Sequence, residues 1–400
     1  MEQVNWKYNL WIAWLGSFLT SASLFLVVPF ISLYVEELGA RGDAVAFYAG
    51  VAISLSAISA ALLAPVWGNL ADRYGRKVMM VRASFVMTFT IGGLAFIPNI
   101  AWLIFLRLLN GVFAGYIPNA TALIASQTPK DKSGYALSTL SSSVVTGSLI
   151  GPFVGGLLAE TIGIRKVFLL AGILLLAVTV FTFFFIKEDF HVVKKEEQIP
   201  VKELFQKMKH KKMLFGLFIT SMIIQTAAQS ISPILPLYIR SLGQKDNITF
   251  VSGLIVSAMG ISSVLSASFM GKLGDRIGNH RLMLLALIYS FIIYIFCANA
   301  HSPLQLGVLR FLFGLGTGAL TPGVNSILSK ITPKEGISRI FSYNQSFYYL
   351  GGVIGPMFGS IIATSLGYHW VFYGTAILVL INFIQNFFNF KNYLYTKDIS

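Results

Sequence analysis

Long runs of hydrophobic residues alternate along this chain with short segments that hold most of the charged residues. No Asp, Glu, Lys or Arg occurs within residues 8–35, 44–71, 133–159, 213–239 or 247–271. A helix needs about 20 mostly apolar residues to cross a bilayer. The apolar character is continuous instead of alternating, which favours helices over membrane-barrel strands. With breaks at Gly, Pro and Asn, the pattern predicts twelve spans, over residues 10–35, 45–70, 79–97, 100–125, 135–160, 167–186, 213–239, 248–271, 282–300, 303–329, 339–364 and 369–390.

The composition excludes a water-soluble globule. The chain has 400 residues, of which 55% are hydrophobic and only 12% are charged. So little polar surface cannot cover a soluble domain of this size. The first hydrophobic run is too long for a signal peptide and lacks a small-residue cleavage site, so we expect it to remain in the mature chain. The prediction is an all-α polytopic membrane protein.

Positive charge is distributed unequally between the two sides that the predicted spans define. Of the 30 Lys and Arg residues, 23 fall on the side of the N-terminus, including those of residues 71–82 and 187–212. Five fall on the other side, and the remaining two, Arg107 and Arg310, lie inside predicted spans. Cytoplasmic loops carry the excess of Lys and Arg, so both termini are predicted to be cytoplasmic. The net charge of +14 then reflects topology and attraction to anionic lipids, and it implies no nucleic-acid partner.

One sequence pattern occurs twice, at a spacing of 203 or 204 residues, which indicates two copies of one structural unit. Because each copy contains six spans, an even number, both copies have the same orientation in the membrane. We predict two six-helix bundles related by a pseudo-twofold axis, residues 1–186 and 213–400, joined by a cytoplasmic linker over 187–212. The linker is a solvated spacer or contains a surface helix at Val201–Met208. The repeated pairs include Pro29 and Pro233, Asp72 and Asp275, Arg107 and Arg310, and Pro152 and Pro356.

The segment between the second and third predicted spans, residues 68–77, combines small residues with clustered charge. Gly68 allows a close approach of helices, and Gly75 permits a tight reversal. The carboxylate of Asp72 lies among basic residues that can pair with it. These are Arg73, Arg76 and Lys77. The segment resembles the signature motif of the major facilitator superfamily, and the resemblance extends over essentially the whole chain. It implies twelve helices in two bundles that rock against each other to give alternating access.

In this resemblance, Asp72 is expected at the cytoplasmic N-terminus of the eleventh helix, near Arg339. The helix dipole and a guanidinium would both favour an anion there. Such a contact would latch the two bundles in one conformation; the alternative is that the basic residues only set the topology. The second copy keeps Asp275 and Arg276 but lacks the Arg–Lys pair, so we expect its latch to be weaker.

Arg107 lies about a third of the way into the fourth predicted span. An arginine at that depth is costly unless it faces a polar cavity or a partner. The segment from Leu103 to Gly115 resembles the helix-4 motif of the superfamily, which implies a role for Arg107 in coupling or substrate orientation. A purely structural anchor is the alternative, and Arg310 is the repeat-related copy.

The fifth predicted span carries glycines on a single helical face. Gly147, Gly151 and Gly155 follow one another at intervals of four residues, which lets another backbone approach closely, and Pro152 removes a helical hydrogen bond. Close packing alone would explain this spacing. With Gly156, however, the pattern resembles the motif that marks antiporters and exporters within the superfamily.

Overall the chain is most similar to the twelve-helix drug:proton antiporter group, particularly the quinolone-efflux branch of Gram-positive bacteria. The resemblance implies a secondary active exporter of the plasma membrane that exchanges amphipathic drugs, such as fluoroquinolones and cationic dyes, for protons. It implies a lipid bilayer, small drugs and protons as partners and a proton gradient as the energy source. We expect no cofactor and a monomeric chain.

The predicted spans contain no Asp or Glu in their interiors, although several drug:proton antiporters carry such a residue near the cavity. The sequence therefore does not identify the residue that carries the proton. The candidates are Glu36, Glu37 and Glu160 at outer helix ends and Asp72 on the cytoplasmic side. Each outer acid has the alternative of a solvated helix-end charge, and Arg107 can also couple indirectly by changing partners.

Uncharged polar residues group on two predicted helices. Gln225 and Gln229 share a face near the middle of the seventh span, and Asn344, Gln345 and Tyr348 lie in the eleventh. Such residues line an otherwise apolar, aromatic binding cavity, or they hydrogen-bond between helices. Both interpretations stay open at the sequence level.

Other classes of function receive less support. A narrow-specificity permease for a sugar, amino acid or peptide usually needs more fixed hydrogen-bonding groups at the midplane. A membrane enzyme would need a metal cluster, phosphate loop or activated nucleophile, and none is recognisable in the loops. The lone Cys297 has no disulfide partner, and no metal site is predicted. A receptor would be expected to carry a folded soluble domain.

Overall fold

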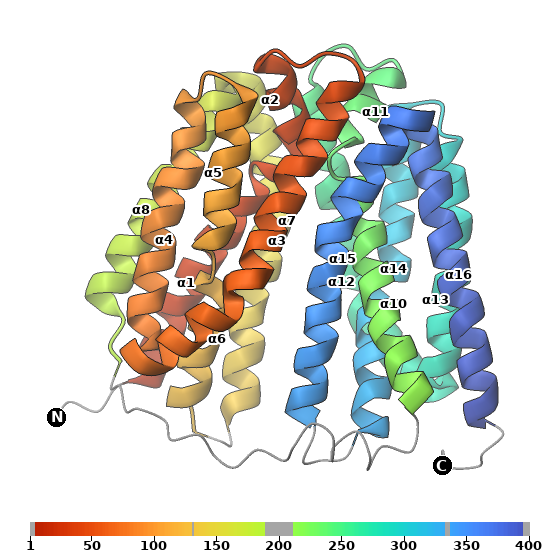
Figure 1. Ribbon diagram of the computed structural model, residues 1–400. Helices are drawn as coiled ribbons and strands as arrows, with labels where there is room; N and C mark the ends of the chain where they lie inside the picture. The colour runs from red at the N-terminus through yellow and green to blue at the C-terminus, as the bar shows by residue number, and fades with distance from the viewer. Residues whose placement is uncertain (1–4, 130–131, 189–210, 333–336, 395–400) are drawn as a thin grey trace. The chain divides into compact units, whose positions relative to one another are not determined.

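In a computed structural model of the chain, which describes residues 5–129, 132–188, 211–332 and 337–394, every regular element is helical (Figure 1). Twelve helical segments of this part are long and apolar enough to cross a membrane, which confirms the predicted spans. The first copy of the repeat forms α1 (Trp6–Phe25), η1 (Val28–Phe30), α2 (Ile31–Glu37), α3 (Asp43–Tyr74), α4 (Arg76–Gly92), η2 (Gly93–Phe96), α5 (Ile100–Val112), α6 (Tyr116–Gln127), α7 (Ser133–Ile162) and α8 (Ile164–Phe185). The second copy forms α10 (Lys211–Ser230), α11 (Leu235–Ser241), α12 (Ile248–Ile277), α13 (Asn279–Ala298), α14 (Pro303–Ile331), α15 (Ile337–Leu366) and α16 (Tyr368–Leu394).

The chain divides into two compact units. The first unit contains residues 1–194 together with 245–257, and the second contains residues 195–244 and 258–400. The beginning of α12 thus belongs to the first unit. The predicted linker lies largely outside the described residues, including its possible helix at Val201–Met208, so the division at 187–212 stays a prediction.

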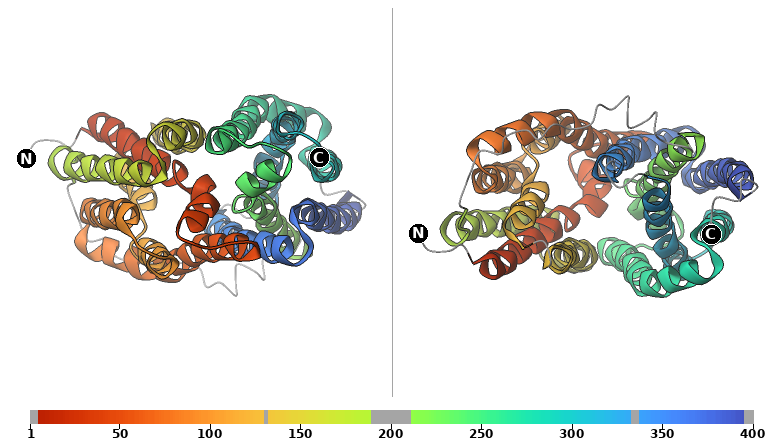
Figure 2. Two further views of the ribbon diagram at one scale, coloured as in Figure 1. Left: turned by 90° about the horizontal axis from the view of Figure 1, so that it is seen from above. Right: turned by 90° about the horizontal axis from the view of Figure 1, so that it is seen from below.

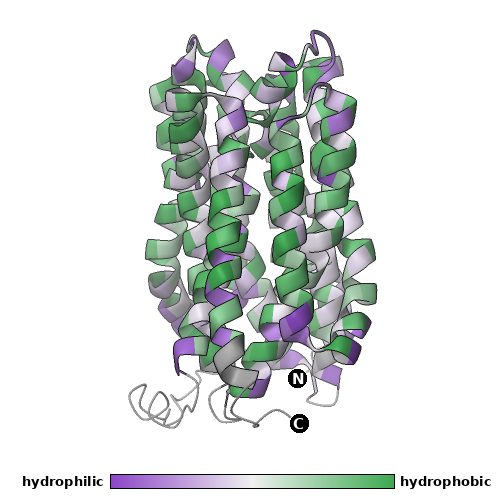
Figure 3. Cartoon of the chain, turned by 90° about the vertical axis from the view of Figure 1, so that its right-hand side faces the viewer, coloured by the Kyte–Doolittle hydropathy of each residue, from purple (hydrophilic) through white to green (hydrophobic). Residues whose placement is uncertain are grey.

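Hydropathy follows the pattern expected of membrane-spanning helices. Hydrophobic residues fill the middle of the helices, and hydrophilic residues gather toward the helix ends (Figure 3). Large apolar side chains such as Leu62, Phe184 and Leu304 are 70%, 68% and 80% exposed. Exposed apolar surface on this scale would be unfavourable in water. In a bilayer these side chains face acyl chains.

Helix ends recur at repeat-related positions. Asn99 begins α5 and Ser302 begins α14, and each side chain accepts a hydrogen bond from the amide three residues later. Such N-caps satisfy a donor that the helix itself leaves unpaired. Gly75 and Gly278 have φ values of +96° and +92°, a conformation that glycine adopts without steric cost. The two copies therefore use the same start and stop signals.

The segment 68–77 is more helical than predicted. α3 continues to Tyr74 and α4 begins at Arg76, so Gly75 alone separates the two helices. The charged residues between them are good helix formers apart from Asp72. The segment between the second and third spans is thus reduced to the tight reversal at Gly75.

The fourth span is predicted as one helix but contains a break. α5 ends at Val112, Gly115 has a φ of +133°, and α6 begins at Tyr116. In the second copy, α14 is continuous and the repeat-related Gly318 is helical. Because both positions are glycine, the sequence repeat alone could not distinguish the broken helix from the continuous one.

Candidate functional site

The charges of the segment 68–77 pair with each other across the end of α3. The Arg76 guanidinium donates a hydrogen bond to the Asp72 carboxylate and forms an ion pair with it one helical turn away. Gly75 supplies the predicted tight reversal. No described atom lies within 4 Å of the position that a Cβ on Gly68 would take. The close helix approach expected at Gly68 is therefore absent from the described part of the chain.

The remaining basic residues of this segment lie over aromatic rings. The Arg73 Cζ atom is 5.5 Å from the ring centroid of Tyr74, and the Lys77 Nζ atom is 5.8 Å from that of Phe183. These distances fall within the range of cation–π contacts, which are weak at exposed sites. Arg73 is exposed and Lys77 is partly buried.

Glu188 fixes the start of α4 and was not among the predicted site residues. Its two carboxylate oxygens accept hydrogen bonds from the amides of Arg76 and Lys77, at 2.8 and 2.7 Å. A carboxylate at a helix N-terminus satisfies unpaired donors and opposes the positive end of the helix dipole. The sequence pattern places Glu188 in a solvated linker, and only the three-dimensional contact reveals its role as a cap.

Replacing Glu188 with alanine is expected to destabilise the first unit by about 0.5–2 kcal/mol, the range measured for lost N-caps. The loss should appear as a lower melting temperature of the purified protein. The melting temperature of Glu188→Gln should lie between those of the parent protein and Glu188→Ala, because its amide offers one acceptor oxygen and no charge. Equal melting temperatures for all three proteins would contradict the capping role.

The segment that corresponds to 68–77 in the second copy of the repeat has different polar contacts. Asn279 begins α13, and its side-chain amide donates to the Ser326 hydroxyl at 2.9 Å. This neutral hydrogen bond occupies the place of the charged pair in the first copy. Arg276 is exposed. The side chains of Asp275 and Arg339 lie outside the described part, so the latch contacts predicted for them stay predictions.

Arg107 lies inside the first unit, where its side chain is 6% exposed. Its Nε atom donates to the Ala52 carbonyl of α3 at 3.4 Å. One turn further along α5, the Asn110 side chain accepts from the Thr90 hydroxyl at 3.1 Å. None of these partners is an acid, so the charge of Arg107 is balanced by dipoles alone among the described residues.

Arg310, the repeat-related arginine, is also buried. It is 3% exposed, and its Nε and Nη1 atoms have no hydrogen-bond partner in the described part of the chain. Its Cζ atom lies 5.4 Å from the ring centroid of Phe313. The repeat-related arginines, Arg107 and Arg310, are therefore both buried within spans with few hydrogen bonds among the described residues.

The glycine face of the fifth span packs on α1, and the packing recurs in the second copy. A Cβ on Gly147 would lie 2.6 Å from the Phe18 carbonyl oxygen, and one on Gly151 would lie 2.9 Å from that of Ala22. Both values are shorter than real Cβ contacts. α7 lies beside α1 in the first unit, as α15 lies beside α10 in the second (Figure 2). The predicted close approach is present.

Other residues of this motif face a different helix. A Cβ on Gly156 would lie 2.7 Å from the Thr249 carbonyl oxygen, in the part of α12 that belongs to the first unit. The Pro152 carbonyl lies against Gly253. α7 continues through Pro152 without interruption. Small residues on two faces thus let α7 contact α1 and the beginning of α12 at once.

The glutamines of α10 lie against the glycine face of α15. A Cβ on Gly351 would lie 2.9 Å from the Cβ atom of Gln225, among other close neighbours. A Cβ on Gly355 would lie at the same distance from the Cβ atom of Gln229. Both glutamines are partly exposed. Their position at a helix seam is compatible with either role considered for them, and their contact with a substrate stays a prediction.

The polar residues of α15 separate into two groups. Asn344 is buried, and its side-chain oxygen accepts from the Ser221 hydroxyl at 2.7 Å. This contact is an interhelical hydrogen bond of the kind considered as the alternative. Gln345 is exposed, and Tyr348 is partly exposed with its ring 6.4 Å from that of Tyr349.

A mutant cycle can decide the role of Asn344. If the residue only joins helices, Asn344→Ala and Ser221→Ala should each lower stability by about 0.6–1.7 kcal/mol, and the double variant should lose little more. Thermal unfolding of purified protein measures this. A loss of transport with Asn344→Ala but not with Ser221→Ala would instead point to substrate contact.

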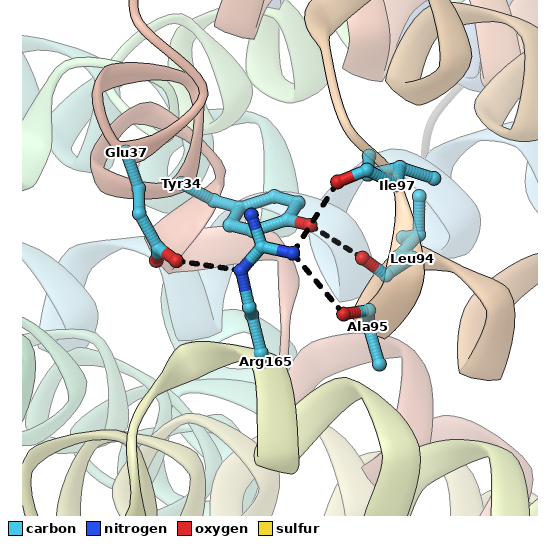
Figure 4. Close-up of polar contacts among 6 residues, drawn as sticks. All are labelled: Tyr34, Glu37, Leu94, Ala95, Ile97 and Arg165. Carbon is cyan, nitrogen blue, oxygen red and sulfur yellow. Dashed lines mark hydrogen bonds and ion pairs between the residues drawn. The ribbon is translucent and has the colours of Figure 1, made fainter.

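Glu37, one of the acids proposed for proton exchange, forms an ion pair with Arg165. The Glu37 carboxylate accepts from the Nε atom of Arg165 at 2.7 Å, and Arg165 also donates to the carbonyls of Ala95 and Ile97, each at 3.3 Å (Figure 4). Tyr34 completes the group by donating its hydroxyl to a neighbouring carbonyl. Both partners of the ion pair are more than 40% exposed, so the pair is solvated.

Glu160 accepts a hydrogen bond from the Thr249 hydroxyl within the first unit, and its side chain is otherwise exposed. The described residues contain no group of three or more His, Cys, Asp or Glu that could hold a metal ion. The candidate functional residues are therefore of three kinds. They are buried arginines, acids at helix ends and the glycines of the helix seams.

A helical protein with twelve apolar spans and buried intramembrane arginines belongs to the class of polytopic membrane transporters, and comparisons with known proteins narrow that class. The model of the Major Facilitator Superfamily matches residues 13–252 and 217–393. The chain therefore belongs to this superfamily of transporters.

Similar proteins extend over the full length. The chain is 63% identical, over 399 residues and 100% of both chains, to a protein of Streptococcus pneumoniae named multi-drug resistance efflux pump PmrA. It is 45% identical to the multidrug resistance protein MdtG of Yersinia enterocolitica, covering 96% of this chain and 94% of the relative. A crystal structure of a bacterial homologue of the human lysosomal transporter Spinster superposes with a TM-score of 0.84 at 13% identity, covering 97% of each chain. The latter similarity shows the fold alone.

Proposed function

We propose that this protein is a secondary active multidrug exporter that exchanges amphipathic drugs for protons by alternating access. The observation that carries the proposal is the 63% identity, along the whole chain, to a protein named as a multidrug efflux pump. Fluoroquinolones and cationic dyes are the proposed substrates.

The side chains of the candidate site support export of amphipathic compounds. The candidate residues of α10 and α15 offer amides, a phenol and aromatic rings instead of a dense set of fixed charges. Such a lining orients bulky amphipathic molecules with few polar contacts. It gives less support to a permease for sugars, amino acids or peptides.

Proton exchange is proposed to use groups near the helix ends. Glu36, Glu37, Glu160 and Asp72 are the candidate carboxylates, and Arg107 can couple indirectly by changing its hydrogen-bond partners when a nearby group is protonated. The proposed location is the plasma membrane with both termini in the cytoplasm, because 23 of the 30 Lys and Arg residues lie on that side of the predicted spans. The proposed active form is a monomer without a cofactor.

Proteoliposomes with an imposed pH gradient test this function. Ethidium or norfloxacin should move against its gradient only when the protein and the pH gradient are present, and an uncoupler should stop the movement. Equal fluxes with and without protein, unaffected by an uncoupler, would reject the exporter. Flux that needs the protein but ignores the pH gradient would reject the proton coupling alone.

A further inference from the structure

The break in the fourth span is contacted by two side chains that flank the signature segment 68–77. Trp67, near the end of α3, donates its indole N–H to the Val112 carbonyl at 2.6 Å. Arg82, in α4, donates from Nη2 to the Ala114 carbonyl at 3.3 Å. Carbonyls at a helix end have no partner within the helix. The two helices joined by the signature segment thus supply the donors for the break.

Trp67 and Arg82 also contact each other, and we call this pair the Trp67–Arg82 clasp. The Arg82 Cζ atom lies 3.5 Å from the ring centroid of Trp67 and 5.9 Å from that of Phe113. The Nε and Nη1 atoms of Arg82 are buried and have no hydrogen-bond partner among the described residues. Ring stacking and one hydrogen bond therefore hold the guanidinium, without a carboxylate. This arginine lies in α4, within the predicted span 79–97.

The clasp is specific to the first copy of the repeat. Met270 and Leu285 occupy the positions that correspond to Trp67 and Arg82. Leu285 is 57% exposed, and α14 runs without a break from Pro303 to Ile331. A continuous helix needs no such donors. The break and the clasp therefore occur together in one copy and are both absent from the other, in the residues that the structure describes.

The position of the break gives it a mechanical consequence. α5 carries Arg107, and α6 continues to the cytoplasmic end of the span. A break with a positive φ at Gly115 lets these two segments change their angle at little cost. Because the clasp ties the break to both α3 and α4, a movement of the signature segment would alter the direction of α5.

We propose that the Trp67–Arg82 clasp positions α5, and with it Arg107, according to the state of the signature segment. Trp67 and Arg82 are then positioning residues for transport that do not contact the substrate. This inference rests on the proposed function as an exporter. In this proposal, a movement of the signature segment reaches Arg107 through two hydrogen bonds, from Trp67 to Val112 and from Arg82 to Ala114. Each of these hydrogen bonds can be removed separately by substitution.

The test uses full-length protein in proteoliposomes. Trp67→Phe keeps an aromatic ring and removes the N–H, and Trp102→Phe is the matched control, because Trp102 is 50% exposed at the opposite end of α5. Trp67→Phe and Arg82→Gln should lower turnover by about tenfold while substrate affinity, measured by equilibrium binding, changes by less than about twofold. Arg82→Lys should recover part of the turnover. In the Trp67→Phe background, Asp72→Asn should cause little further loss, since both changes interrupt one path.

Hydrogen exchange gives a readout that does not depend on transport. Amides of residues 113–119 should exchange faster in Trp67→Phe than in the parent protein or in Trp102→Phe. Unchanged exchange, full turnover in Trp67→Phe, or a loss of affinity in proportion to turnover would each overturn the clasp. If the parent protein moves no drug, the proposed function fails, and the exchange rates still decide whether the clasp holds the break.

Discussion

Gly155→Ala is expected to destabilise the protein by about 1–3 kcal/mol, the range for added methyl groups in well-packed interiors, and to abolish drug efflux. The new Cβ would lie 3.0 Å from both the Cα and the carbonyl carbon of Leu26, and closer still to its oxygen. These are backbone atoms of the residue that caps the C-terminus of α1, so no side chain can rotate away. The seam between α1 and α7 would have to separate along its length.

The matched control for this substitution is Gly323→Ala in α14. The nearest atom to its added Cβ would be the Met283 Cβ atom at 3.8 Å, which is ordinary contact. Alanine favours helix over glycine by about 1 kcal/mol, so Gly323→Ala should leave the melting temperature unchanged or raise it. Thermal unfolding in detergent and dye efflux from proteoliposomes measure both variants. A Gly155→Ala protein as stable as Gly323→Ala would show that the helices do not need this approach.

The spans could be predicted because hydrophobicity and length alone determine which segments cross a bilayer. Their ends were predicted from breaks at Gly, Pro and Asn, and α3 extends beyond its predicted end at residue 70 to Tyr74. The packing face of α7 was also readable, since spacing by four residues puts Gly147, Gly151 and Gly155 on one side of a helix.

The contacts of the candidate residues could not be predicted in the same way. Asn344 has the composition of a binding residue, and its hydrogen bond to Ser221 depends on how α10 and α15 pack. Glu188 reads as a linker charge, and its role as a cap depends on where the first turn of α4 lies. Tertiary neighbours separated by more than 100 residues decide both cases.

The break at Gly115 marks the limit of the repeat as a guide. Equivalent glycines stand at 115 and 318, yet only the first has a positive φ. At the first break Trp67 and Arg82 of neighbouring helices donate to the free carbonyls, and Met270 and Leu285 stand at the corresponding positions of the second copy. Local sequence similarity within a helix therefore does not determine its continuity.

Arg107→Ala is expected to abolish drug efflux while leaving the amount of protein in the membrane unchanged. A charged residue in the middle of a spanning helix opposes insertion by about 2.5–3.5 kcal/mol on translocon scales, so its removal makes insertion easier. The side chain makes one long hydrogen bond, from Nε to Ala52, so alanine removes little polar pairing, and a melting temperature measures the packing that it loses. A loss of efflux would then report on coupling or substrate orientation instead of folding.

Two further variants serve as comparisons for Arg107→Ala. Arg107→Lys keeps the positive charge but loses the planar guanidinium, so partial efflux is expected if charge is what the mechanism uses. Arg41→Ala removes an exposed arginine outside the spans and should transport normally. Drug efflux, proton uptake and substrate binding are measured for each in proteoliposomes. If Arg107→Ala transports at the rate of Arg41→Ala, the buried arginine is a structural anchor, and Glu36, Glu37, Glu160 and Asp72 remain the candidates for coupling.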